Sequence, residues 1–94
     1  MGSPAGNKDF GSYVGDGSAA LREFKAGFAP GYLKIWSAEG TVEFTERLPQ
    51  AAKRLATGVL SFIDGLSCNE HGWSMESADD ALNKTGVVYY YMSE

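Results

Sequence analysis

Cysteine and histidine are almost absent from this chain, which has one of each, Cys68 and His71, among its 94 residues. A single cysteine cannot form an intrachain disulfide, so the chain is not a disulfide-stabilised scaffold, and we expect a reducing, cytoplasmic location. Structural zinc sites need four ligands, mostly cysteine and histidine. We therefore predict no metal site and no other cofactor.

Long hydrophobic runs are also missing. The longest apolar run covers only residues 87–92, whereas a membrane-spanning helix needs about 20 apolar residues. Residues 1–7 have no apolar stretch behind a basic start, so the sequence predicts no secretory signal peptide. We accordingly expect no membrane association.

Basic residues are scarce in the last third of the chain. Residues 1–63 hold seven bases and six acids, whereas residues 64–94, the acidic third, hold six acids and only Lys84, so the net charge of −4 arises there. Such a negative field repels nucleic-acid phosphates and attracts basic protein surfaces. The same charge would also be explained as an aid to solubility. We expect a protein partner with a basic surface rather than nucleic acid.

The composition is that of one small globular domain, with 44% apolar and 21% charged residues. Residues 1–17 hold five of the 12 glycines and are predicted to be a flexible N-terminal segment, because each glycine adds backbone entropy that folding must remove. Phe10, Tyr13 and Val14 interrupt this segment and can attach it to the domain as a short edge strand. Residues 18–94 are predicted to form a single α+β domain.

The clearest predicted element is an amphipathic helix over residues 49–64. Its apolar residues recur at spacings of three and four: Leu48, Ala52, Leu55, Val59, Phe62, Ile63 and Leu66. Pro49 suits the first turn, and Gly65 suits the left-handed position after the last one. Gly58 inside the helix costs about 1 kcal/mol relative to alanine. Leu55, Val59 and Ile63 are the expected core residues.

Two shorter helices are predicted, one over residues 19–26 that Ser18 caps, and one that Ser77 opens, with Asp79 and Asp80 in its first turn. Alternating residues at 32–37 and 41–46, joined by a glycine-bearing loop, predict a β-hairpin. Residues 73–75 and 87–92 are predicted strands, and the last is placed centrally because both its faces are apolar. The order α-β-β-α-β-α-β predicts an α+β two-layer sandwich with a mixed sheet of about four strands, one long helix and two short helices.

Cys68, Glu70 and His71 are the candidate centre of a small enzyme or ligand-binding domain, because an imidazole can activate a thiolate and both groups bind metals. No orienting third group and no further ligands accompany them, so we expect neither Cys68 nor His71 to be essential. The glycine-rich residues 11–18 lack the lysine of a phosphate-binding loop and are interpreted as a connector. Asp79 and Asp80 are explained by their position at a helix start.

Aromatic side chains gather on one face of the predicted sheet. Leu33 and Ile35 alternate with Tyr32, Lys34 and Trp36, and the run of three tyrosines adds at least one more, for which we take Tyr90. Trp and Tyr are enriched at binding hot spots. The predicted partner-binding residues are Tyr32, Lys34, Trp36, Glu76, Asp79, Asp80 and Tyr90. Stacking of single-stranded RNA, or a third layer formed by the N-terminal segment or a second subunit, would also explain such a face.

These observations favour a small acidic binding or regulatory protein that is not an enzyme and acts by protein–protein contact. If its carboxylates mimic phosphates, it would be an inhibitor of a nucleic-acid-handling partner, for example from a phage or another mobile element. Two alternatives stay open. One is an enzyme or ligand-binding domain centred on Cys68, Glu70 and His71, and the other is a structural homo-oligomer such as a homodimer.

Overall fold

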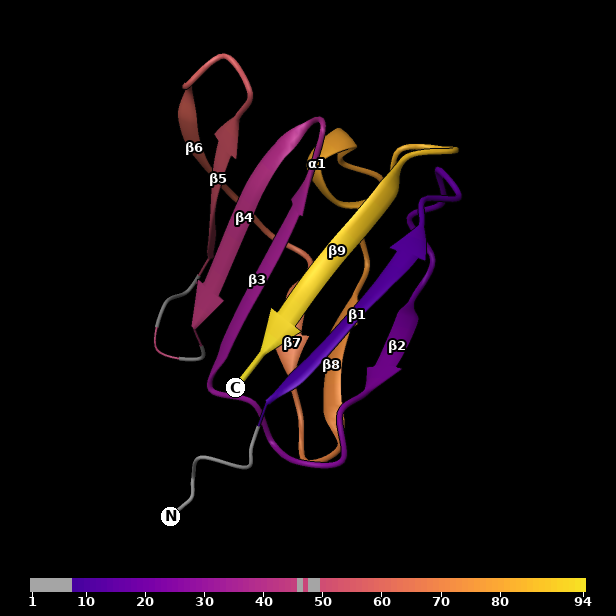
Figure 1. Ribbon diagram of the computed structural model, residues 1–94, viewed down its shortest axis with the longest axis vertical. Coiled ribbons are helices and arrows are strands. Elements are labelled where there is room, and N and C mark those ends of the chain that lie inside the picture. Colours follow the sequence, from indigo (N-terminus) through magenta and orange to yellow (C-terminus); the bar gives the residue numbers. More distant parts are fainter. Residues whose placement is uncertain (1–7, 46, 48–49) are drawn as a thin grey trace.

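The chain folds almost entirely into β-strands, as the computed structural model shows for residues 8–45, 47 and 50–94 (Figure 1). Six strands form a large antiparallel sheet in the order β1-β9-β3-β4-β5-β6, and three form a smaller antiparallel sheet in the order β2-β8-β7. The large sheet contains β1 (Asp9–Val14), β9 (Val88–Ser93), β3 (Tyr32–Ser37), β4 (Gly40–Thr45), β5 (Ala51–Leu55) and β6 (Leu60–Ile63). The small sheet contains β2 (Arg22–Lys25), β8 (Gly72–Met75) and β7 (Leu66–Cys68).

The hydrophobic core lies between the two sheets. The small sheet covers the lower half of the large sheet in Figure 1, and the short helix α1 (Asp80–Asn83) covers the upper half. Side chains alternate along each strand, so every second residue of the large sheet points into the core. The buried apolar residues are Tyr13, Leu33, Ile35, Val42, Phe44, Ala51, Trp73, Met75, Ala81, Leu82 and Tyr89.

The predicted β-hairpin over residues 32–37 and 41–46 is confirmed as β3 and β4, with residue 46 outside the described residues. Leu33 and Ile35 are fully buried opposite Phe44 and Val42. The last strand, β9, is an interior strand between β1 and β3, but it lies next to the edge strand and leaves Val88 and Tyr90 exposed, so its expected central, doubly covered position is not what the structure has. Residues 9–14 of the glycine-rich N-terminal segment form the edge strand β1, which pairs with β9 along its whole length.

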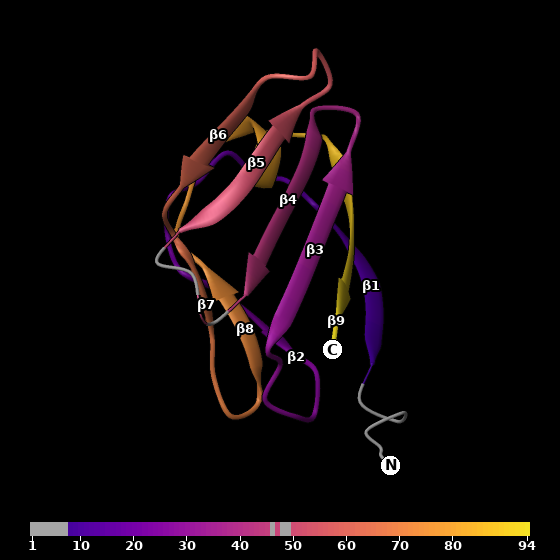
Figure 2. The same ribbon diagram turned by 90° about the vertical axis from the view of Figure 1, so that its left-hand side faces the viewer.

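The predicted long helix is wrong. Residues 51–63 form the hairpin β5–β6 instead, which extends the large sheet beyond β4 (Figure 2), and residues 48 and 49 lie outside the described residues. Gly58 has φ of +95°, and the Gly58 amide donates to the Leu55 carbonyl at 2.8 Å. This turn reverses the chain between two strands, and Val59, a predicted core residue, is 56% exposed beside it. Apolar spacing alone did not distinguish a helix from two short strands. Gly58 in the middle of the segment was the sequence signal that favoured a turn.

The predicted helix over residues 19–26 is also wrong, because residues 22–25 form β2. Ser18 does act as a local acceptor, since its Oγ accepts from the Ala20 amide at 3.0 Å, but only a turn follows. Phe24 is drawn into the core by stacking on Trp73, with ring centroids 4.1 Å apart, and this long-range contact outweighs the weak local preference.

The last predicted helix exists as α1, but Asp79 caps it in place of Ser77. The Asp79 carboxylate accepts from the Ala81 amide at 2.9 Å, while Ser77 Oγ accepts from the Asp79 amide at 3.1 Å. The described residues include four in an α-helix and form two antiparallel sheets, so the fold is a β-sandwich, and the predicted α+β class with a mixed sheet is wrong. No helix of the described residues has the length and hydropathy needed to cross a membrane.

Candidate binding surface

The face of the six-stranded sheet that points away from the core, here called the outer face, presents two rows of side chains in register across all six strands. The first row is Phe10, Met92, Lys34, Glu43, Ala52 and Phe62. The second row is Ser12, Tyr90, Trp36, Thr41, Arg54 and Leu60. Val14 and Val88 pair beyond the second row, and Tyr32 and Thr45 pair beyond the first.

The outer face is unusually apolar for an exposed sheet face. Nine large hydrophobic residues are exposed among the described residues, and seven of them lie here: Phe10, Val14, Trp36, Leu60, Phe62, Val88 and Tyr90. Phe10 and Phe62 are 65% and 60% exposed at the two edges of the sheet. The rings of Trp36 and Tyr90 stack across neighbouring strands with centroids 6.4 Å apart. Antiparallel sheets that face water usually carry polar side chains, so this surface needs an explanation.

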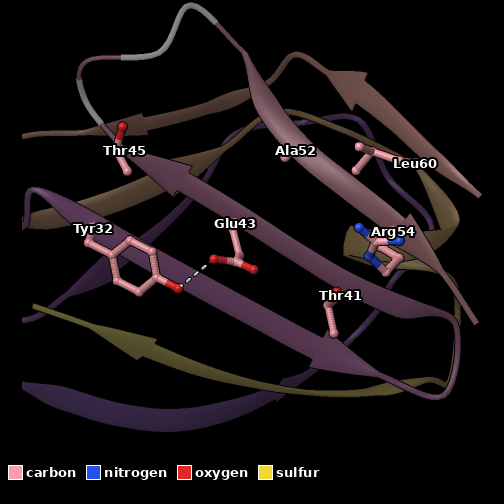
Figure 3. A pocket seen from close by; sticks show the side chains of 7 residues that line it. All are labelled: Tyr32, Thr41, Glu43, Thr45, Ala52, Arg54 and Leu60. Carbon is pink, nitrogen blue, oxygen red and sulfur yellow. Dashed lines mark hydrogen bonds between the residues drawn. The ribbon is translucent and has the colours of Figure 1, made fainter. Parts of the chain in front are cut away.

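Two hollows interrupt the outer face. The first has a volume of about 260 Å³ and lies over β3 to β6 (Figure 3). Its lining residues are Tyr32, Thr41, Glu43, Thr45, Ala52, Arg54 and Leu60. The second has a volume of about 370 Å³ and is lined by Lys34, Trp36, Thr41 and Met92. Because Thr41 lines both, the hollows adjoin each other in the middle of the face.

Tyr32 and Glu43 form a hydrogen-bonded pair in the first hollow. The Tyr32 hydroxyl donates to Glu43 Oε2 at 2.9 Å, as Figure 3 shows. Burial raises the pKa of Tyr32 to about 12, and the hydrogen bond and charge of Glu43 act in the same direction. The phenol therefore stays protonated and holds the carboxylate in place on the face.

Within its strands the outer face carries the charged residues Lys34, Arg54 and Glu43, and Glu94, which adjoins Tyr32, forms an ion pair with Lys8 at its margin. None of the first three forms an ion pair with another described residue. Arg54 Nη1 donates to the Gly58 carbonyl at 3.3 Å. Among the described residues, no ion pair on this face therefore neutralises Lys34, Glu43 or Arg54.

The predicted acidic partner residues lie away from the outer face. Both carboxylate oxygens of Asp79 are 2.9 Å from Lys53 Nζ, and Lys53 alternates with Ala52 and Arg54 on β5, so it points to the core side. Asp80 is exposed and helps to line a separate hollow of about 430 Å³ together with Lys53 and the Glu39 side of the β3–β4 turn. Glu76 is exposed after β8. The structure thus brings together Tyr32, Lys34, Trp36 and Tyr90 and separates them from Glu76, Asp79 and Asp80.

Cys68, Glu70 and His71 lie at the turn between β7 and β8. Glu70 and His71 are exposed, and Asn69 organises the turn by accepting from the His71 and Gly72 amides at 2.8 and 2.9 Å. Across the residues with defined positions, no group of three or more His, Cys, Asp or Glu side chains is arranged to hold a metal ion.

Sequence reasoning missed the half of the outer face that β5 and β6 supply. Arg54, Leu60 and Phe62 were assigned to a helix. In the structure, Ala52 and Arg54 on β5 alternate with residues that point into the core, and Leu60 and Phe62 on β6 do the same. That two-residue alternation was the available signal, but each strand is too short for it to dominate the helical spacing. Phe10 was recognised only as an attachment point for the N-terminal segment.

Comparison with known proteins gives a weak and partial similarity to two fungal proteins. No family model matches the chain, and no solved structure matches it. The probable pectate lyases C of Aspergillus flavus and Aspergillus oryzae are each 32% identical to it over 66 residues, which is 70% of this chain and 15% of the enzyme. The chain therefore spans about 15% of the length of the curated proteins it matches. The similarity is limited to a short stretch of these proteins.

Proposed function

We propose that the chain is a non-catalytic contact domain that binds another polypeptide through its outer face. The observation that supports this proposal is the distribution of large exposed apolar side chains: of the nine in the part of the chain that the structure describes, seven lie on one sheet face. Solvent-exposed apolar patches of this breadth usually mark interaction sites. The aliphatic members, Val14, Leu60 and Val88, favour a polypeptide because its side chains can bury them.

Trp36 and Tyr90 are the proposed energetic centre of the contact. They are stacked on each other in the second row, near the middle of the sheet, and large aromatic side chains at the centre of an interface commonly contribute most of the binding energy. Lys34, Glu43 and Arg54 would set the orientation of the partner, since charges at an interface add specificity more than affinity.

The acidic third has a separate proposed role. Glu76 and Asp80 are exposed and would attract a partner with a basic surface, whereas Asp79 is already paired with Lys53. Such charges mainly raise the rate of association. A phosphate-mimicking inhibitor would act through this surface, because Glu76 and Asp80 are exposed on it.

Site-specific photocrosslinking tests the proposal. Benzoylphenylalanine in place of Tyr90 should form adducts with a polypeptide, and the same photoreactive residue in place of Leu21, which is exposed outside the outer face, should not. Trp36→Ala in the chain that carries the label at position 90 should lower the adduct yield, since it removes a central anchor. Equal yields at positions 90 and 21, or no polypeptide adduct at either, would contradict the proposal.

Binding of an anionic polysaccharide is the second candidate, and the partial match to probable pectate lyases favours it. Lys34 and Arg54 would bind the carboxylates of such a polymer, while Trp36 and Tyr90 would pack against its sugar rings. Electrophoresis through gels containing polygalacturonate should then retard the chain, and Arg54→Ala should remove the retardation. Equal mobility in gels with and without the polymer would exclude this candidate.

A further inference from the structure

The outer face is complementary to itself when a second copy is turned about an axis that runs along the strands between β3 and β4. Such a rotation places β3 of one copy over β4 of the other and keeps each row of side chains over the same row. Closed dimers use a two-fold axis of this kind, in which residue i meets residue j and j meets i. The two rows therefore decide whether the contact is favourable.

The first row pairs opposite charges under this rotation. Lys34 and Glu43 are direct cross-strand neighbours on β3 and β4. The rotation therefore places Lys34 of each copy over Glu43 of the other copy. Tyr32 holds Glu43 through one carboxylate oxygen, Oε2, which leaves Oε1 to accept from the lysine of the second copy. The two-fold axis makes this contact twice.

The second row pairs an aromatic ring with a cation. Tyr90 lies one strand outward from Trp36 on β9, and Arg54 lies one strand outward from Thr41 on β5, so the rotation brings Tyr90 over Arg54. A guanidinium over a tyrosine face is attractive, and more so when water is excluded. Trp36 comes over Thr41, which lines both hollows and is the smaller side chain, so a bulky group meets a recess.

We propose that the partner of the outer face is a second copy of this chain, docked sheet against sheet about this axis. This inference rests on the proposed contact function and names its partner. With neighbouring strands about 4.8 Å apart, the six strands span roughly 24 Å, and stacked sheets pack about 10 Å apart with strands within about 30° of each other. The Lys34–Glu43 contacts tolerate that angle because they lie beside the axis, and the Tyr90–Arg54 contacts lie one strand farther out.

A charge-exchange experiment tests this geometry. The wild-type chain should be a dimer by sedimentation equilibrium, and K34E and E43K alone should each raise the dimer dissociation constant at least about tenfold, because each places like charges together twice. Mixing K34E with E43K should restore the dimer, since both inter-chain contacts then join opposite charges. A lost contact inside one chain would not be repaired by mixing.

Matched reversals on the other sheet are the control. E23K and K25E change exposed charges on β2, outside the outer face, and should leave the dissociation constant unchanged. Circular dichroism of every variant checks that the fold is kept. Failure of mixing to restore the dimer, or a wild-type chain that stays monomeric at all concentrations, would overturn the inference. A monomer that crosslinks from position 90 to a different polypeptide would overturn only the choice of partner, whereas the absence of any position-dependent polypeptide adduct would overturn the proposed contact function as well.

Discussion

The solvent-facing sides of the two sheets differ in polarity. On the three-stranded sheet the outward positions are polar: Glu23 and Lys25 are exposed on β2, and the Ser67 and Ser74 hydroxyls hydrogen-bond to each other at 2.8 Å. On the six-stranded sheet the outward positions include Phe10, Trp36, Phe62 and Tyr90. Both sheets bury their inner faces in the same core, so stability of the fold does not explain the difference. The proposed contact with a partner would explain it.

The largest expected effect separates the inner side of the six-stranded sheet from its outer face. Ile35 is fully buried, while its neighbour Trp36 is 37% exposed. Ile35→Ala should therefore lower the free energy of unfolding by about 2–5 kcal/mol through lost burial and a residual cavity, and Trp36→Ala by less than about 1.5 kcal/mol. Urea unfolding followed by circular dichroism measures both. Equal losses would mean that the outer face stabilises the fold as much as the core side does, and would contradict the contrast between the two sides of the sheet.

A second expected effect concerns the buried Tyr13. Its hydroxyl donates to the Leu82 carbonyl at 2.7 Å, so Tyr13→Phe should cost about 1–3 kcal/mol by leaving that carbonyl unpaired. Burial also raises the pKa of Tyr13 above its usual value of 10.0.

The raised pKa gives this tyrosine a predictable pH dependence. Its contribution to stability is complete below pH 10, because both the folded and unfolded states are protonated there. It is lost as the pH rises further, because the unfolded chain releases the proton first. Thermal melts from pH 8 upward should show a falling Tm above pH 10 and a shallower fall for Tyr13→Phe. A Tm that does not change over this range would contradict the assignment.

A third, smaller effect is expected where the acidic third meets the sandwich. Asp79→Ala removes both the cap of α1 and the partner of Lys53, whose side chain is only 15% exposed. The loss should be about 1–2 kcal/mol. Asp80→Ala is the matched control, because Asp80 is exposed and forms no ion pair with the described residues. Similar losses for the two variants would show that Asp79 has no special structural role and is open to a partner.

The smallest effect is expected at the turn between β5 and β6. Val59 is exposed there, so Val59→Asp should change the free energy of unfolding by no more than about 0.5 kcal/mol. The helical interpretation of residues 49–64 demands the opposite result, since an unpaired carboxylate in the core would unfold the domain. A cooperative melt near the wild-type Tm supports the hairpin.

The sequence by itself determined those strands whose residue pattern fits a strand and no other element. Strict alternation from Tyr32 to Trp36 places Leu33 and Ile35 on one side and the aromatic residues on the other, because successive side chains of a strand point to opposite faces. The β-branched and aromatic run at the C-terminal end specified β9 in the same way. These predictions needed no information about distant contacts.

Only the tertiary structure decided the rest. Residues 51–63 have apolar spacings that suit a helix as well as two short strands, and pairing of β5 with β4 selects the strands. The same pairing brings Arg54, Leu60 and Phe62 onto the face that Trp36 and Tyr90 occupy, although these residues are far apart in sequence. It also turns Lys53 toward Asp79. The ion pair that they form neutralises this carboxylate, so Asp79 adds little to the exposed negative charge. Strand order and register arise from long-range packing, so a local sequence pattern cannot specify them.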